Sequence, residues 1–140
     1  MSDDLDIERR LQLLEEFMRR RETDSKGTAF GVWTPTLSNT TNIDASTAFE
    51  GQYLRVGSTV LCGVRVEVDA TAAANTVLGI SLPIASNFGA NSDCSGTGNR
   101  AAGGSGEVRA NTTSDIAEFA YTATTTANAA YYLVFAYQVI

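Results

Sequence analysis

The sequence contains no histidine, and its single lysine, Lys26, lies near the N-terminus. The missing imidazole excludes Ser-His-Asp and Cys-His catalysis and removes the most common general base. A lysine Schiff base is excluded from the whole chain beyond residue 26. These absences predict a protein that is not an enzyme and that binds neither a cofactor nor a metal ion.

Cysteine is also scarce, with Cys62 and Cys94 alone in 140 residues. Two cysteines are too few for a disulfide scaffold, and their separation matches no metal-finger spacing. We interpret them as two reduced, buried thiols, with a bridge between them as the alternative.

Long apolar runs and clusters of basic residues are absent as well. No stretch reaches the roughly 18 to 20 apolar residues of a membrane span, and the N-terminus is acidic where a secretion signal is basic. The net charge of −6 and the pI near 4.5 argue against nucleic acid and anionic membranes as partners. We expect proteins or neutral glycans as partners and synthesis in the cytoplasm.

Carboxylates are the remaining route to catalysis. Glu67 and Asp69 fall on the same side of one predicted strand, about 7 Å apart at their α-carbons, as in some glycoside hydrolases. The same alternation places both opposite a valine face, so the pattern favours a solvated strand surface over a catalytic pair.

Charge is distributed unevenly along the chain. Residues 1–26 hold eight acidic and six basic side chains, which is more than half of all the charges in the protein. A sequence of 140 residues is long enough for one domain with a hydrophobic core. The boundary near Gly27 therefore predicts an N-terminal helical segment at 1–26, for anchoring or coiled-coil formation, and a head at 27–140.

The N-terminal segment has a narrow apolar seam. Ile7, Leu11, Leu14 and Met18 follow one another at the spacing of a coiled coil, and Leu13 and Phe17 widen the stripe. Acidic residues at the start and arginines at the end complement the helix dipole. Such a helix is marginal alone in water, so it needs a partner surface. Self-association or docking to another protein is one interpretation, and folding back onto the head as an amphipathic cover is the other.

The rest of the chain is typical of β-strands. Val60, Cys62, Val64, Val66 and Val68 alternate with more polar residues, which predicts a strand with one buried face. Seven or eight strands in this length predict an antiparallel β-sandwich, jelly-roll-like in topology. We separately expect the head to be trimeric. The further strands are expected at 29–37, 49–56, 76–82, 106–110, 116–124 and 130–140.

The last of these strands is apolar on both faces. Tyr131, Leu133, Phe135 and Tyr137 form one face, and the opposite face is interrupted only by Gln138. One face is expected to pack into the core, so the strand predicts a subunit contact around a symmetry axis. We assign Tyr131, Leu133, Phe135 and Tyr137 to that contact together with the helix seam. A central strand under a long loop is the alternative.

One segment and one residue could contact a ligand. Residues 91–106 are rich in glycine and serine and predict a flexible surface loop, without the lysine that phosphate-binding loops carry. Trp33 is a candidate ligand contact, because such rings stack on sugars. An anchor in the core or in an interface is the other interpretation of Trp33.

Four phrases carry a family resemblance. They are Gly31 to Leu37 (GVWTPTL), Gln52 to Gly57 (QYLRVG), Leu78 to Phe88 (LGISLPIASNF) and the ending Phe135 to Ile140 (FAYQVI). Together they resemble a small β-sandwich module in virion proteins of tailed bacteriophages, over most of residues 31–140. The resemblance implies a virion location and transfers no active-site residue.

The resemblance and the two-part organisation lead to two functional hypotheses. The first is a trimeric capsid decoration (cement) or head-fibre protein, anchored by its helix, whose partners are its own copies and other virion proteins such as the major capsid or tail protein. The second is the receptor-binding head of a short tail fibre that recognises a host surface glycan.

Overall fold

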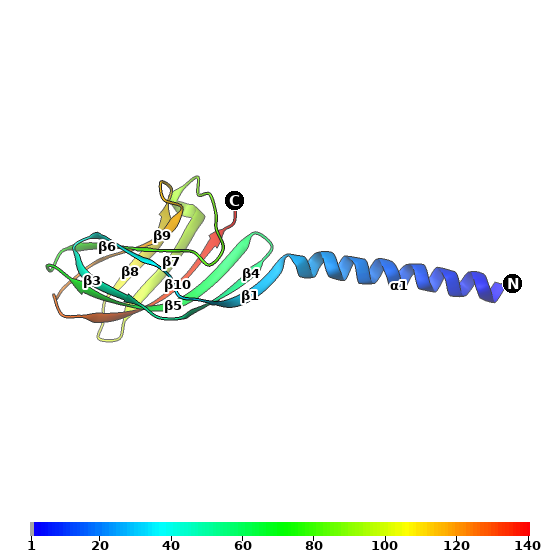
Figure 1. The fold of residues 1–140 in the computed structure, drawn as a ribbon, viewed down its shortest axis with the longest axis horizontal. Helices are drawn as coiled ribbons and strands as arrows, with labels where there is room; N and C mark the ends of the chain where they lie inside the picture. Colours follow the sequence, from blue (N-terminus) through cyan, green and yellow to red (C-terminus); the bar gives the residue numbers. More distant parts are fainter. Residues whose placement is uncertain (1) are drawn as a thin grey trace.

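The computed structural model describes residues 2–140 and the side chains of 4–18 and 27–140. One helix, α1 (Ser2–Lys26), precedes a head of antiparallel strands, which confirms the predicted mainly β fold with an N-terminal helix (Figure 1). The strands are β1 (Thr28–Trp33), β2 (Leu37–Thr41), β3 (Ile43–Ala48), β4 (Gly51–Val56), β5 (Thr59–Ala70), β6 (Asn75–Ile80), β7 (Cys94–Arg100), β8 (Ser105–Asn111), β9 (Ile116–Thr122) and β10 (Ala129–Gln138), with a short 3₁₀ helix, η1 (Asn91–Asp93), before β7.

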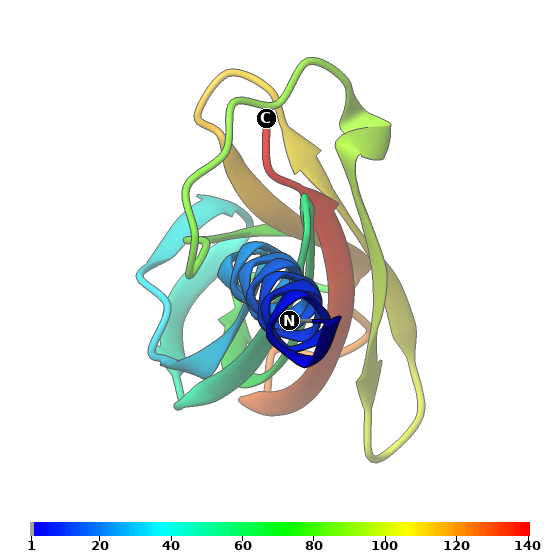
Figure 2. The same ribbon diagram turned by 90° about the vertical axis from the view of Figure 1, so that its right-hand side faces the viewer.

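The ten described strands form one hydrogen-bonded sheet in the order β1-β4-β5-β10-β7-β8-β9-β6-β2, and β3 pairs with the far end of β5. The sheet curls, so that its two halves cover a common core (Figure 2). Strands β2 and β3 meet where the curl returns on itself, and Ser46 Oγ donates a hydrogen bond to Asn39 Oδ1 at 2.5 Å. The curl lets a single sheet bury one face without a second layer.

Alternation along β5 decides which face is buried. Val60, Cys62, Val64, Val66 and Val68 point into the core, as the period of two predicted, and each is at most 6% exposed. Aromatic rings fill the space opposite them: Phe119, Tyr121 and Tyr131 pack at centroid distances of 4.6–5.3 Å. Burial of these side chains provides the main stabilisation of the head.

The structure corrects the face assigned to β10. Tyr131, Leu133, Phe135 and Tyr137 are 1–5% exposed and lie inside the head, so they cannot form a contact between subunits. Strand β10 is central, paired with β5 and β7, and residues 81–90 pack over its C-terminal end. In that packing the Tyr137 hydroxyl donates to the carbonyl of Ile84 at 2.7 Å. The alternative of a central strand under a loop is the correct one for this face.

The prediction of a flexible loop at 91–106 is wrong. Most of this segment belongs to β7 and the start of β8, which pair with each other, and β7 also pairs with β10. Its glycines allow close packing: a Cβ at Gly96 would overlap the backbone of Val134 and Phe135, and one at Gly98 would overlap Leu133 and Phe119. Gly96 and Gly98 are therefore required by close approach of strands and rings.

Helix α1 projects away from the head, and the described contacts between the two lie where the helix joins β1 (Figure 1). Its seven described apolar side chains are all more than half exposed: Leu5, Ile7, Leu11, Leu13, Leu14, Phe17 and Met18. The helix ends at Lys26, and Gly27 forms the turn into β1. It does not fold back onto the head, so the amphipathic-cover alternative is wrong.

Candidate interaction surfaces

The first candidate surface is the helix seam, defined as Ile7, Leu11, Leu14 and Met18. These side chains are 53–58% exposed, although the 4-3-4 spacing aligns them along one side of α1. The spacing places Ile7 and Leu14 at heptad position d and Leu11 and Met18 at position a. Among the predicted ion pairs, Asp6–Arg10 forms at 3.7 Å, while the pairs with Arg19 and Arg20 involve side chains outside the described set.

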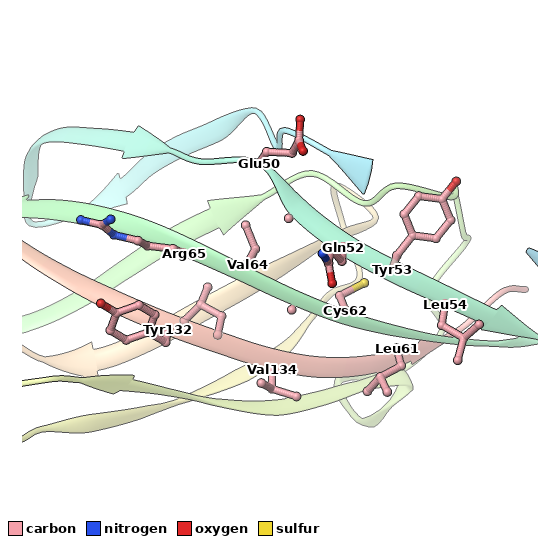
Figure 3. A pocket seen from close by; sticks show the side chains of 13 residues that line it. Glu50, Gln52, Tyr53, Leu54, Leu61, Cys62, Val64, Arg65, Tyr132 and Val134 are labelled. Atoms are coloured by element: carbon pink, nitrogen blue, oxygen red, sulfur yellow. The ribbon is translucent and has the colours of Figure 1, made fainter. Parts of the chain in front are cut away.

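The second candidate surface is the outer apolar face, defined as Phe30, Val32, Leu54, Val56, Leu61, Tyr132 and Val134. These residues lie on β1, β4, β5 and β10, and their exposed fractions run from 42% for Leu54 to 82% for Phe30. Figure 3 shows Leu54, Leu61 and Val134 projecting from neighbouring strands on the same side of the sheet. This face is the solvent side of the half of the sheet that leads into the helix.

The outer apolar face is hollowed over Gly63. An open depression of about 610 Å³ is lined by side chains that include Gln52, Leu54, Leu61 and Val134 (Figure 3). A Cβ added at Gly63 would have no neighbour within 4 Å, so the missing side chain is what opens the floor of the depression.

Sequence reasoning recognised the β10 part of this face as a second apolar side of the last strand, assigned the subunit contact to the opposite side, and missed the part of the face on β1. Its signal was present in the alternation of Phe30 and Val32 with Ala29 and Gly31, where the larger side chains share one side of β1. The signal was ambiguous because periodicity alone does not say which side of a strand faces the core.

Trp33 lies at the end of β1 and is half-buried against the core. Its indole N–H donates to the carbonyl of Ser81 at 3.1 Å, and its ring meets Tyr53 edge-on at 6.4 Å. These contacts are those of a structural anchor. Ligand contact by Trp33 stays a prediction.

The two cysteines are free and buried in the core, on β5 and at the start of β7. Burial raises the pKa of each thiol to about 12. Both thiols are therefore protonated and shielded at neutral pH, which is typical of structural cysteines.

Glu67 and Asp69 lie on the outer side of β5, away from the core. Glu67 accepts hydrogen bonds from Arg65 Nη2 at 2.8 Å and from Asn128 Nδ2 at 3.2 Å. Its two carboxylate oxygens are thus engaged by neighbouring side chains. Within the described residues, no three His, Cys, Asp or Glu side chains gather as metal ligands would.

Comparisons with known proteins found no match, whether to family models, to curated proteins or to solved structures.

Within the described part of the chain, no helix has an apolar stretch long enough to cross a membrane.

Proposed function

We propose that this chain is a non-enzymatic structural protein of a bacteriophage virion: a trimeric capsid decoration or head-fibre protein held in place by its N-terminal helix. The observation that carries the proposal is the helix seam, which stands clear of the head with every described apolar side chain exposed. The virion setting rests on the resemblance of the four phrases in residues 31–140.

An exposed seam on a 25-residue helix is a strong argument for association. Most helical stability in proteins comes from packing an apolar face rather than from the intrinsic helix propensity of the residues. Because the head leaves that face uncovered, another helix or another protein must cover it. Coiled-coil spacing favours other helices of the same kind.

Charges beside the seam favour a parallel arrangement of the helices. With Leu14 at position d, Arg10 occupies position g and Glu15 occupies position e. In a parallel bundle, Arg10 of one helix faces Glu15 of its neighbour, which is an attractive pair. In an antiparallel pair, e positions face each other, and Glu8 and Glu15 would repel. A parallel bundle places all the heads at one end.

A second apolar pair remains available beside the seam. Leu13 and Phe17 are four residues apart, are both 62% exposed and lie outside the a and d positions. In the proposed bundle this pair contacts the capsid or tail protein that anchors the trimer. The helix thus supplies both self-association and attachment, and the heads project away from the anchoring site.

Recognition of a host glycan is the second hypothesis from the sequence. It depends on the segment 91–106, most of which belongs to β7 and the start of β8, and on Trp33, whose indole N–H donates to the carbonyl of Ser81. No observation favours it over assembly.

The test compares Leu14→Asp with Gln12→Asp. Both variants add one negative charge to the same helix, but only the first places it in the seam. In sedimentation equilibrium the wild type and Gln12→Asp are expected to be trimeric, and Leu14→Asp to be largely monomeric. Virions assembled with Leu14→Asp should lack the protein, whereas those with Gln12→Asp should carry it. A wild-type chain that stays monomeric at every concentration would contradict the proposal.

A further inference from the structure

We propose that the outer apolar faces of the three copies meet around the threefold axis of the trimer, with the Phe30 ring of each copy seated in the depression over Gly63 of the next. The inference rests on the proposed function, because the helices bring the copies together. It adds a second subunit contact, made by the heads, to the one made by the helix seam.

The strand register gathers the apolar side chains into rows. Phe30 on β1 lies opposite Leu54 on β4, Leu54 lies opposite Leu61 on β5, and Leu61 lies opposite Ala136 on β10. Side chains directly across neighbouring strands share one side of a sheet and touch. The row therefore forms a continuous apolar band across four strands, from the edge of the sheet to its middle.

The face has a projecting group and a receiving hollow. Phe30 is 82% exposed, the highest value among the large apolar residues of the described chain. The depression over Gly63 measures about 610 Å³, which falls in the range of sites that accept small organic groups. Phe30 and Gly63 are separated by a single strand, β4, in the sheet order. Around the axis of the bundle, each copy can place its Phe30 ring in the depression over Gly63 of the next copy.

Beyond β10, the outer side of the sheet is polar rather than apolar. On the outer side of β7 and β8 the residues are Ser95, Thr97, Asn99, Glu107 and Arg109, all polar. Large exposed apolar patches on otherwise polar surfaces mark sites of protein association. The contrast within one sheet confines the contact to β1, β4, β5 and β10.

Two charged residues, Glu50 and Arg65, line the depression, whereas the apolar row from Phe30 through Leu54 and Leu61 to Ala136 contains none. Arg65 forms an ion pair with Glu67 at 2.8 Å, and its guanidinium lies 4.4 Å from the centre of the Phe49 ring. Depletion of charge at the centre is typical of subunit interfaces. It matters here because two copies of a chain with net charge −6 repel each other elsewhere.

Continuity with α1 identifies a second copy as the occupant. Only Gly27 separates the helix from β1, so a parallel bundle of helices brings the β1 strands of the copies together at its end. β1 is also the edge of the sheet, with β4 as its only partner among the described strands. Along this edge, Phe30 is the first large apolar side chain after the helix, followed by Val32.

The area available fits an oligomer. Aromatic side chains carry about 150–250 Å² each, so the exposed fractions of the seven residues amount to several hundred square ångströms. A stable interface buries about 800 Å² on each partner. The outer apolar face supplies most of that area, and the helix seam supplies the remainder.

The experiment measures association of the full chain by sedimentation equilibrium in Phe30→Ala, Gly63→Val and their double variant. Both positions are open in the monomer, so neither change disturbs the fold of the head. Each single variant is expected to raise the dissociation constant about ten-fold or more. Thr122→Val, on the exposed side of β9, is the control for added apolar surface and should behave as wild type.

The double variant tests the contact itself. If the ring enters the hollow, removing the ring and filling the hollow abolish the same interaction, and their effects are not additive. Strict additivity would overturn the pairing of Phe30 with Gly63. Association within two-fold of wild type in both single variants, with Leu14→Asp still monomeric, would overturn the head contact and leave the helix proposal intact. A monomeric wild type would overturn both.

Discussion

The head and the helix differ in how far their apolar side chains are exposed to solvent. In the head, the alternating residues of β5 and β10 that point inward are almost completely buried, as Val66 and Phe135 illustrate at 0% and 1% exposure. In α1, every described apolar side chain is more than half exposed, although the spacing of the seam is regular. The inward-facing side chains of the head are thus buried within one chain, whereas the apolar side chains of the helix are left uncovered by it.

Within the head, the two sides of one sheet differ in the same respect: apolar side chains are buried on one side and exposed on the other. The inner side of β4, β5 and β10 is closed by the curl of the sheet, and the outer side carries the outer apolar face. The buried residues on the inner side stabilise the fold, and the exposed residues on the outer side are available for contact with another protein. Substitutions on the two sides should separate stability from association.

The largest effect is expected at Phe135. Phe135→Ala empties a buried position and should lower the free energy of unfolding by about 3–5 kcal/mol, measured by chemical denaturation of the head. Val134→Ala, one residue away on the outer side, should change it by less than about 0.5 kcal/mol. Similar losses in the two variants would show that both sides of β10 contribute to the fold of the monomer.

Two glycines give the next comparison. Gly96→Ala forces a Cβ into the backbone of β10 and should destabilise the head by about 1–3 kcal/mol. Gly63→Ala meets open space and should be neutral or stabilising by up to about 1 kcal/mol, because glycine weakens a strand. Thermal unfolding by circular dichroism separates the two, and a loss of stability in Gly63→Ala would contradict the open outer side.

The buried thiols predict a dependence on alkaline pH. Burial raises the pKa of Cys62 and Cys94 from 9.0 to about 12, so the unfolded thiols lose protons at a lower pH than the folded ones. Between these values the unfolded state binds fewer protons, and stability falls as pH rises, by up to about 1.4 kcal/mol per pH unit for each thiol.

The range from pH 9 to pH 10 tests this best, because burial also raises the pKa values of Tyr121 and Tyr137, which ordinarily titrate near 10.0. The slope is measured by denaturation at several pH values. The variant Cys62→Ala/Cys94→Ala should flatten it, and an unchanged slope in that variant would contradict burial of the thiols.

The smallest effect is expected for Leu14→Asp on the head. Since Leu14 is exposed and the described contacts of α1 with the head lie at its junction with β1, the charge should leave the unfolding free energy of the head within about 0.5 kcal/mol of wild type. The comparison is made on monomers, at low protein concentration. A larger loss would mean that the helix stabilises the head and that the two regions do not act separately.

Local patterns predicted much of the fold. The seam spacing from Ile7 to Met18 predicted the helix, and the alternation from Val60 to Val68 predicted β5 with its buried side. Both predictions succeeded because period and burial agree along a single element. The segment 91–106 failed because glycine is typical of loops, and its role in β7 depends on rings and backbone that come from elsewhere in the chain.

Of the two subunit contacts predicted from the sequence, the structure leaves one exposed and buries the other. The seam was predicted from its spacing, and the structure leaves it exposed. The contact assigned to Tyr131, Leu133, Phe135 and Tyr137 fell on the inner side of β10, because both sides of that strand are apolar and composition does not distinguish them.

By itself, the sequence determined the elements of this protein: a charged helix with one apolar seam, strands with alternating sides, and a boundary at Gly27. Only the tertiary structure decided which side is inside where both sides of a strand are apolar, as in β10, since that depends on how the sheet curls and on which strands become neighbours. It also decided that the helix stands free, because a seam of this kind packs equally well on a head or on a partner.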